Sequence, residues 1–268
     1  MRLALPVRGA VLELEVTVCR VADLLPHEEV VADYLERLKR ALSASAYQHN
    51  PVVVDAQSNV ILDGTHRWAA MRDLGFEWIA ACKVDYSNPL VELDSWARAY
   101  PPADGPARRL LERLGASPLG TPSVSESSLA VVGAGWGYEI AYSDLADAFR
   151  RLRELERELQ LLTGRAPTYV PRSSWERYAR GALLLLPPKP SKAEVVRAAR
   201  EGRLLPPKST RHVIPARPVR VNVPLKLLRS RHLDPALVDE LLKQKRMFLL
   251  EPPVVLDREY QELLLLFA

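Results

Sequence analysis

With 268 residues, 48% of them hydrophobic, the chain can bury a full core without disulfides or structural metal, and its two cysteines, Cys19 and Cys82, lack zinc-site spacing. Lys and Arg outnumber Asp and Glu by 37 to 33, an excess that suits an anionic ligand but is too small for a dedicated nucleic-acid binder. No apolar run approaches the roughly 20 residues that span a bilayer and no secretory signal begins the chain, so we expect a soluble, reduced, cytoplasmic protein.

The first hundred residues have the pattern of one small α+β unit. Alternating or β-branched segments predict strands at 11–19, 51–55, 60–62 and 78–84, the middle two as a hairpin. An amphipathic pattern predicts a helix over 28–43, with Glu28 and Glu29 in its first turn. A second helix is predicted over 65–74, where Gly75 is placed to end it.

A proline-rich stretch at 101–106 marks a boundary. Beyond it, the pattern predicts helices at 107–114, 142–162, 191–200 and 235–245, a hairpin within 131–140, and a strand at 183–186. Ser191 and Glu194 have the spacing of a capping box, and Gly202 follows that helix. We therefore predict an N-terminal domain over 1–100, a second α/β domain over 101–228, and a helical C-terminal extension over 229–268.

The segment Asp63-Gly64-Thr65-His66-Arg67 joins the expected hairpin to the following helix. Glycine lets the backbone approach a ligand closely, and the first amides of a helix bind phosphate well, the more so beside an arginine and a histidine. An ordinary tight turn, with Arg67 in a surface ion pair, explains the same spacing equally well. The residues alone leave both interpretations open.

A second dense set of phosphate-binding residue types lies in the proline-rich loop near residue 210. Lys208, Thr210, Arg211 and His212 combine the point charge of lysine with the planar fork of arginine, a combination able to clamp an anionic oxygen cluster. A solvated basic loop is the simpler interpretation, and spacing alone favours it.

Two single residues complete the candidate set. Glu28 follows His27 at the expected helix start, where the macrodipole favours a carboxylate, although an ordinary surface glutamate has the same pattern. Trp96 precedes the proline-rich boundary and would either wall a small pocket or seal a domain interface; the residues alone favour a place in the core. The local sequence marks neither residue as functional.

The stretch Val60-Ile-Leu-Asp-Gly-Thr-His-Arg-Trp68-Ala-Ala70, followed by Leu74-Gly75 and a strand, resembles the ParB/sulfiredoxin superfamily. Members of that superfamily carry a Gly-x-x-Arg loop that binds nucleotide phosphates. The match covers about residues 11–86 and implies an α+β, ParB/sulfiredoxin-like N-terminal domain. Sulfiredoxin keeps a catalytic cysteine directly before its His-Arg pair, and Thr65 at that place argues against sulfiredoxin chemistry.

The chain is still more similar to the archaeal free serine kinases, which carry three separated motifs in the same order. His27-Glu28 resembles the His-Glu at the start of their first long helix, and residues 63–68 resemble their Asp-Gly-His-His-Arg-Trp-like loop. Residues 208–213 resemble their distant Lys-Thr-Thr-Arg-His-Val-like loop. The likeness covers most of 11–225, loosely at 105–180. Thr65 replaces a family histidine, and the tail beyond about residue 228 extends past the usual end.

The resemblance implies a phosphotransferase that makes O-phospho-L-serine from free L-serine, with ATP or ADP as donor and Mg²⁺ as counter-ion, for cysteine or serine metabolism. It implies that Glu28, in a catalytic N-terminal domain, accepts the serine proton. The other implied site residues are Asp63, Gly64, Thr65, His66 and Arg67 for the nucleotide, and Trp96, Lys208, Thr210, Arg211 and His212 for serine and phosphate. The active site is expected in a cleft between the N-terminal and second α/β domains.

The alternative interpretation is a ParB-like, nucleotide-dependent DNA-binding protein, and a regulatory relative without free-serine activity is a third class. We expect L-serine and a nucleotide as partners, and neither a membrane nor nucleic acid. The sequence does not choose between ATP and ADP or define the oligomeric state. It also fixes no metal ligand, although Asp63 is the nearest carboxylate to the phosphate-binding loop.

Overall fold

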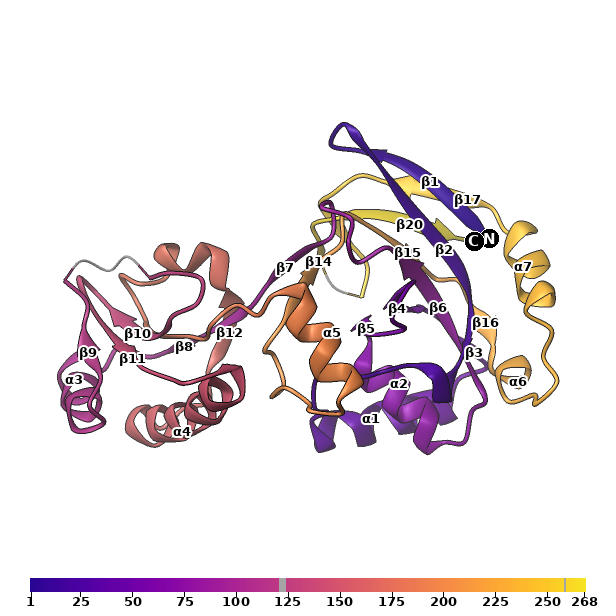
Figure 1. The fold of residues 1–268 in the computed structure, drawn as a ribbon. Helices are drawn as coiled ribbons and strands as arrows, with labels where there is room; N and C mark the ends of the chain where they lie inside the picture. The colour runs from indigo at the N-terminus through magenta and orange to yellow at the C-terminus, as the bar shows by residue number, and fades with distance from the viewer. Residues whose placement is uncertain (121–123, 258) are drawn as a thin grey trace. The chain divides into compact units, whose positions relative to one another are not determined.

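The computed structural model describes residues 1–120, 124–257 and 259–268 (Figure 1). The chain forms two compact units, each assembled from segments that are distant in sequence. Unit 1 consists of residues 1–92, 196–204 and 212–268, and unit 2 consists of residues 93–195 and 205–211. Each unit has its own sheets and its own buried apolar cluster.

A five-stranded sheet of order β1-β2-β6-β4-β5 forms the centre of unit 1 (Figure 1). Its strands are β1 (Arg2–Val7), β2 (Ala10–Arg20), β4 (Val52–Asp55), β5 (Ile61–Asp63) and β6 (Trp78–Val84). β6 runs antiparallel to β2 and parallel to β4. All four residues of β4 are buried, which explains why this strand is continuously apolar up to Asp55.

The helices of unit 1 are η1 (Val21–Asp23), α1 (Ala32–Ser43), α2 (Thr65–Asp73), α6 (Leu225–Leu228) and α7 (Pro235–Lys243). α1 packs against α2, and α2 lies against β4 (Figure 1). Gly75 follows α2 with a φ of +71°, as expected for a glycine that ends a helix. In the described part of the chain, no helix combines the length and apolar character that crossing a membrane requires.

The remaining strands of unit 1 bring the C-terminal segment into the fold. They are β3 (Tyr47–Gln48), β15 (Ala216–Val219), β16 (Val223–Pro224), β17 (Met247–Leu250), β18 (Val254–Val255), β19 (Glu259–Tyr260) and β20 (Leu263–Phe267). β20 lies between β15, to which it is parallel, and β17, to which it is antiparallel. Leu264, Leu265 and Phe267 of β20 are buried, so the tail contributes to the core of unit 1.

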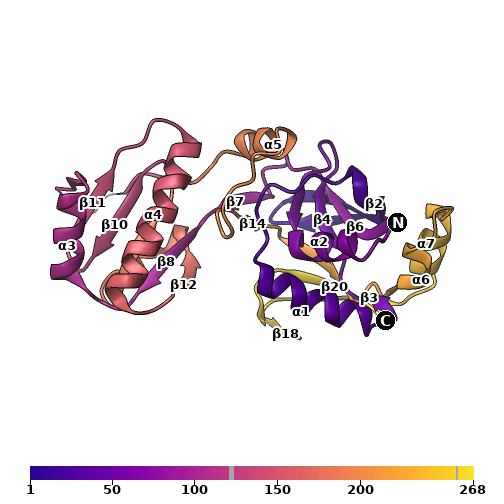
Figure 2. The ribbon, with the colours of Figure 1, turned by 90° about the horizontal axis from the view of Figure 1, so that it is seen from below.

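Unit 2 is built on a six-stranded sheet of order β12-β8-β13-β10-β11-β9. Its strands are β8 (Trp96–Tyr100), β9 (Ser117–Pro118), β10 (Leu129–Gly133), β11 (Trp136–Ile140), β12 (Thr168–Pro171) and β13 (Leu183–Leu186), and its helices are α3 (Asp104–Arg113), α4 (Leu145–Thr163) and η2 (Arg172–Arg177). The four leucines of β13 are fully buried inside this sheet. α4 packs against β8, as Figure 2 shows.

Three elements span the division between the units: β7 (Glu92–Asp94), α5 (Lys192–Arg200) and β14 (Arg211–Val213). The predicted capping box begins α5, because the Ser191 amide and hydroxyl both donate to the Glu194 carboxylate at 2.8 Å and the Glu194 amide donates to Ser191 Oγ at 3.2 Å. This element is therefore confirmed with its cap.

One predicted helix begins later than expected. α1 starts at Ala32, so the prediction that Glu28 and Glu29 occupy its first turn is wrong. Leu25 forms a parallel bridge with Val60, and Val31, the N-cap residue, is extended at φ −86° and ψ +119°. Pairing of this segment and its β-branched valines thus hold the chain extended before the helix. Glu28 lies in extended chain before α1, so the predicted effect of the helix macrodipole on a first-turn carboxylate does not apply to it.

The division of the chain also differs from the predicted segments. β8 pairs with β12 and β13, so residues 96–100 belong to the sheet of unit 2 rather than to the N-terminal domain. β15 pairs with β20, which places residues 216–219 in unit 1 together with the tail. The tail beyond residue 228 contains α7 but also β17 and β20, because its apolar residues complete a sheet.

Candidate functional site

The turn between β5 and α2 is shaped around Gly64. This residue has a φ of +94° and is the N-cap of α2, with no side-chain cap. A Cβ here would lie 2.8 Å from Val52 Cγ1 and 3.0 Å from an Arg67 guanidinium nitrogen, so the position requires glycine. Helix geometry leaves the first amides of α2 without intrahelical acceptors, which is the arrangement that binds anions.

The charged residues of this turn are held by specific partners. The Arg67 guanidinium donates to the Pro51 carbonyl at 2.9 Å, and burial lowers the pKa of Arg67, an effect that the nearby Asp63 opposes. An arginine stays protonated despite such a shift. Asp63 Oδ2 accepts a hydrogen bond from Arg217 at 2.6 Å, and Arg217 Nε donates to Glu262 at 2.8 Å. The turn thus has a fixed guanidinium beside a carboxylate that is held by Arg217, which also pairs with Glu262.

His66 has a defined proton position. Its Nε2 accepts a hydrogen bond from the Val31 backbone amide at 2.9 Å, and the Tyr34 ring meets it edge-on with centroids 4.9 Å apart. Because a backbone amide can only donate, Nε2 carries no proton and the neutral ring is protonated at Nδ1. Val31 thereby connects His66 to the segment that contains Glu28.

Glu28 lies in a cluster with two histidines and a tyrosine within unit 1. The Glu28 side chain is 16% exposed, and its Oε1 is 3.9 Å from Nε2 of the buried His27. The His27 ring meets the His212 ring edge-on at 5.3 Å, and His212 Nε2 is 2.8 Å from the Tyr86 hydroxyl. Burial lowers the pKa of His27, although the Glu28 carboxylate opposes this shift, so His27 brings no positive charge to the carboxylate at neutral pH.

A second cluster lies within unit 2, around the Trp96 ring. Lys208 Nζ is 5.5 Å and Arg211 Cζ is 5.4 Å from the ring centroid, distances at which a cation is attracted to an aromatic face. Arg211 also lies 3.6 Å from Asp94, whose carboxylate accepts a 2.8 Å hydrogen bond from Ser173 Oγ. Two cations are thus gathered over one tryptophan.

The structure assigns the predicted site residues to both units. Glu28, the turn at 63–67 and His212 belong to unit 1, whereas Trp96, Lys208, Thr210 and Arg211 belong to unit 2. The second predicted loop is therefore divided between the units, with Thr210 buried and Lys208 at a φ of +64°. The active-site cleft expected between two domains stays a prediction.

The sequence analysis did not identify Tyr86, Asp94 or Arg217 as partners of the predicted residues. Each lies outside the motifs and contacts a motif residue that is far away in sequence. Arg217 is 154 residues from Asp63, Tyr86 is 126 residues from His212, and Asp94 contacts Arg211. Local spacing carries no signal for such pairs, and only the sheet topology brings them together.

Among the described residues, no group of three or more His, Cys, Asp or Glu side chains could hold a metal ion. Asp63, the carboxylate nearest in sequence to the phosphate-binding loop, already accepts a hydrogen bond from Arg217. A Mg²⁺ ion needs only one or two protein carboxylates when substrate phosphates and water supply its other ligands. The residues present therefore suit a cation that arrives with a nucleotide better than a permanent metal site.

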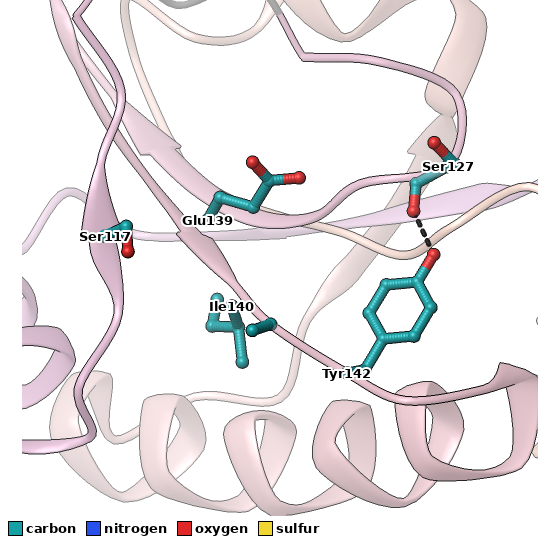
Figure 3. Close-up of a pocket in the computed structure, with 6 residues that line it drawn as sticks. Ser117, Ser127, Glu139, Ile140 and Tyr142 are labelled. Atoms are coloured by element: carbon teal, nitrogen blue, oxygen red, sulfur yellow. Dashed lines mark hydrogen bonds between the residues drawn. The ribbon is translucent and has the colours of Figure 1, made fainter.

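Unit 2 also contains an open cavity of about 350 Å³ (Figure 3). The residues that line it are Ser117, Ser127, Glu139, Ile140, Ala141 and Tyr142. The Tyr142 hydroxyl donates to the Ser127 carbonyl, and burial, with Glu139 adding to it, raises the pKa of Tyr142. None of the predicted site residues lines this cavity.

No protein-family model matches the chain. Among characterised sequences, a ParB-like protein of Sulfolobus acidocaldarius is 31% identical over 194 residues, which are 71% of this chain and 86% of that protein. The chain therefore belongs to the ParB-like protein family. An ATP-dependent L-serine kinase of Staphylothermus marinus is 26% identical over 231 residues, covering 78% of this chain and 89% of the relative. An ADP-dependent L-serine kinase of Thermococcus kodakarensis is 26% identical over 226 residues, covering 76% and 88%.

The fold is shared with solved structures. A mutant free serine kinase in complex with ADP superposes with a TM-score of 0.64 at 21% identity, over 80% of this chain and 94% of that one. A C-terminally truncated SbnI from Staphylococcus aureus gives a TM-score of 0.61 at 19% identity, over 86% and 94%. Together with the ParB-like relative, these confirm the predicted α+β, ParB/sulfiredoxin-like fold.

Proposed function

We propose that this chain is a kinase that transfers a phosphoryl group from ATP or ADP to the hydroxyl of free L-serine, giving O-phospho-L-serine. The observation that carries the proposal is that residues from all three distant motifs meet within unit 1, His212 being the one from the third. The His27 ring, next to Glu28, meets the His212 ring at 5.3 Å, and Val31 of the same segment donates to His66 of the turn at 63–67. The relatives named ATP- and ADP-dependent L-serine kinases support this choice of substrate.

The nucleotide phosphates would bind at the turn between β5 and α2. The outward amides of the first turn of α2, the Nδ1–H group of His66 and the guanidinium of Arg67 are donors that suit phosphate oxygens. Repulsion of the anion by Asp63 is reduced, because Arg217 donates to its carboxylate at 2.6 Å. This arrangement cradles phosphate without a lysine-containing P-loop.

Glu28 would act as the general base. As the serine oxygen forms its bond to the terminal phosphorus, its proton passes to the Glu28 carboxylate, while the bond from that phosphorus to the bridging oxygen breaks. ADP leaves when ATP is the donor, and AMP leaves when ADP is the donor. Glu28 is only 16% exposed, and its neighbour His27, whose pKa burial lowers, brings no positive charge to the carboxylate at neutral pH.

Lys208 and Arg211 would neutralise charge on the transferring phosphoryl group, and Trp96 would border the serine. The cation–π contacts with Trp96 restrain both cations, which reduces the ordering required when substrate binds. Thr210 and His212 would complete this set. Mg²⁺, bound with the donor, would supply counter-charge to its phosphates. A cytoplasmic location suits the two buried thiols, Cys19 and Cys82.

The proposal is tested by the rate of phosphoserine formation in Glu28→Gln, with Glu29→Gln as the matched neighbour. Removing a general base costs about 10²–10⁴-fold. We expect Glu28→Gln to lose at least about 100-fold in kcat and to keep its nucleotide affinity, and Glu29→Gln to stay within twofold of wild type. Equal rates for Glu28→Gln and wild type would exclude the assigned role.

A further inference from the structure

Arg98 is a wholly buried arginine on β8, two residues after Trp96, and none of the three motifs includes it. It is paired across the sheet with Tyr169 of β12 on one side and Leu185 of β13 on the other. Burying a guanidinium is costly unless every donor meets an acceptor. The acceptors that Arg98 contacts therefore indicate the role of this buried guanidinium.

Three of those acceptors are main-chain carbonyls in and beside the cluster around Trp96. Arg98 Nη1 donates to the Trp96 carbonyl at 2.7 Å and to the Lys208 carbonyl at 3.1 Å, and Nη2 donates to the Pro207 carbonyl at 3.3 Å. Its Nε forms an ion pair with Glu156 of α4, which anchors the fork from the opposite side. One guanidinium thus connects β8, at Trp96, to the loop that contains Pro207 and Lys208.

The loop that Arg98 holds is conformationally demanding. Lys208 has a φ of +64°, which a lysine adopts only at an energetic cost, and Ser209 Oγ donates to the Pro206 carbonyl at 2.7 Å beside it. Hydrogen bonds from Arg98 to the carbonyls of Pro207 and Lys208 fix the peptides on both sides of this conformation. The direction of the Lys208 side chain depends on that backbone.

We propose that Arg98 is a positioning residue that sets the geometry of Lys208 and Trp96 for substrate binding. The proposal rests on the proposed function for the identity of the substrate, but its geometric part concerns unit 2 alone. Only a planar fork reaches three carbonyls and a carboxylate together, so lysine cannot replace arginine here. A displacement of about 1 Å in a positioned group can cost about 100-fold in rate.

The matched control is Arg172, a second buried arginine of unit 2. Its guanidinium donates to the carbonyls of Pro187 at 2.7 Å and Ser125 at 2.5 Å, two residues that do not belong to the cluster around Trp96. Arg98→Lys and Arg172→Lys therefore remove the same kind of group from the same unit. Glu156→Gln provides a milder change, which leaves the Arg98 fork in place and removes only its anionic anchor.

Two readouts on the full chain separate positioning from simple destabilisation. The first is the split between kcat/KM for serine and the dissociation constant for nucleotide. We expect Arg98→Lys to lose at least about tenfold in kcat/KM, with nucleotide affinity within twofold, and Glu156→Gln to show a smaller loss in the same direction. Arg172→Lys should keep kcat/KM within twofold of wild type, even if its melting temperature falls as much as that of Arg98→Lys.

The second readout needs no activity: amide hydrogen exchange of residues 205–211, followed by mass spectrometry. It should accelerate at least about tenfold in Arg98→Lys and stay unchanged in Arg172→Lys. Wild-type exchange in Arg98→Lys, or equal effects of both arginine variants, would overturn the inference. If Arg98→Lys does not fold, Glu156→Gln decides: a lower kcat/KM together with faster exchange of residues 205–211 supports the inference, and wild-type values of both overturn it. A wild-type protein that forms no phosphoserine would refute the proposed function, while the exchange result would still judge Arg98.

Discussion

At the level of single residues, Gly64 decides whether the backbone between β5 and α2 can follow its observed course. An alanine there would have to adopt a left-handed backbone conformation, which costs about 1–2 kcal/mol, and its Cβ would lie 2.8 Å from Val52 Cγ1. We predict that Gly64→Ala loses at least about tenfold in nucleotide affinity, measured by calorimetry. Gly75→Ala is the control, because it carries the same backbone cost at φ +71° with no atom within 4 Å of the added Cβ. Equal nucleotide affinities in both variants would contradict the phosphate-binding role.

His27 predicts a specific dependence of stability on pH. Burial lowers the pKa of His27 in the folded state below its ordinary value of 6.5, so below that pH the unfolded chain takes up a proton that the folded chain refuses. Stability is therefore full above pH 6.5 and falls as the pH drops, by at most about 1.4 kcal/mol per pH unit from this group.

The measurement is the free energy of unfolding of wild type and His27→Gln between pH 7 and pH 5. We expect the slope with pH to be shallower in His27→Gln. The exposed His232, replaced in His232→Gln, should leave the slope unchanged. A wild-type slope in His27→Gln would show that His27 is not the buried titrating group.

At the level of elements, periodicity predicted the features that local sequence determines. The hairpin β4–β5, helix α2 with Gly75, strand β6 and the four leucines of β13 all lie where the pattern placed them, because each is set by its own apolar spacing and turn residues. The candidate turn at 63–67 was predictable for the same reason, since its glycine and helix start are local.

What periodicity missed is set by tertiary pairing. The strand β1 was not predicted; it forms a hairpin with β2 through Arg8 and Gly9, both at positive φ. The start of α1 is delayed by the pairing of Leu25 with Val60. The contact of Arg217 with Asp63 joins strands 154 residues apart, and no local rule predicts it.

The cap of α5 offers a test at this level. Ser191→Ala removes the acceptor of the Glu194 amide and the donor to its carboxylate, and loss of such a cap costs about 1 kcal/mol. We predict that Ser191→Ala lowers the free energy of unfolding, measured with urea, by about 1 kcal/mol. Ser43→Ala, at an exposed position at the end of α1, should change stability by less than about 0.5 kcal/mol. Equal effects would mean that the capping box adds nothing.

At the level of the whole molecule, the chain crosses between units within β7, α5 and β14, which no boundary drawn from composition anticipates. The proline-rich stretch at 101–106 lies inside unit 2, where residues 101–103 join β8 to α3 and residues 104–106 begin α3. Composition shifts mark loops, and a unit assembled from three segments has no single loop at its edge. The predicted segments and the observed units therefore differ for a topological reason.

The net charge of +4 bears on the alternative, DNA-binding interpretation. Binding to duplex DNA through many phosphate contacts weakens steeply with salt, by about 10³–10⁵ between 50 and 200 mM for 6–10 contacts. We predict no measurable binding to duplex DNA at about 0.15 M salt, with or without CTP, in fluorescence anisotropy. Binding that requires CTP and falls steeply with salt would favour the ParB-like function instead.

The most direct test of the central claim is the identity of the product formed from L-serine by the purified chain, with ATP, ADP and CTP supplied in turn. Phosphorus NMR distinguishes O-phosphoserine from inorganic phosphate released by hydrolysis. The account predicts O-phosphoserine with ATP or ADP, formed in step with ADP or AMP and exceeding inorganic phosphate when serine is saturating. The absence of O-phosphoserine with all three nucleotides, or hydrolysis that rivals its formation, would contradict the account.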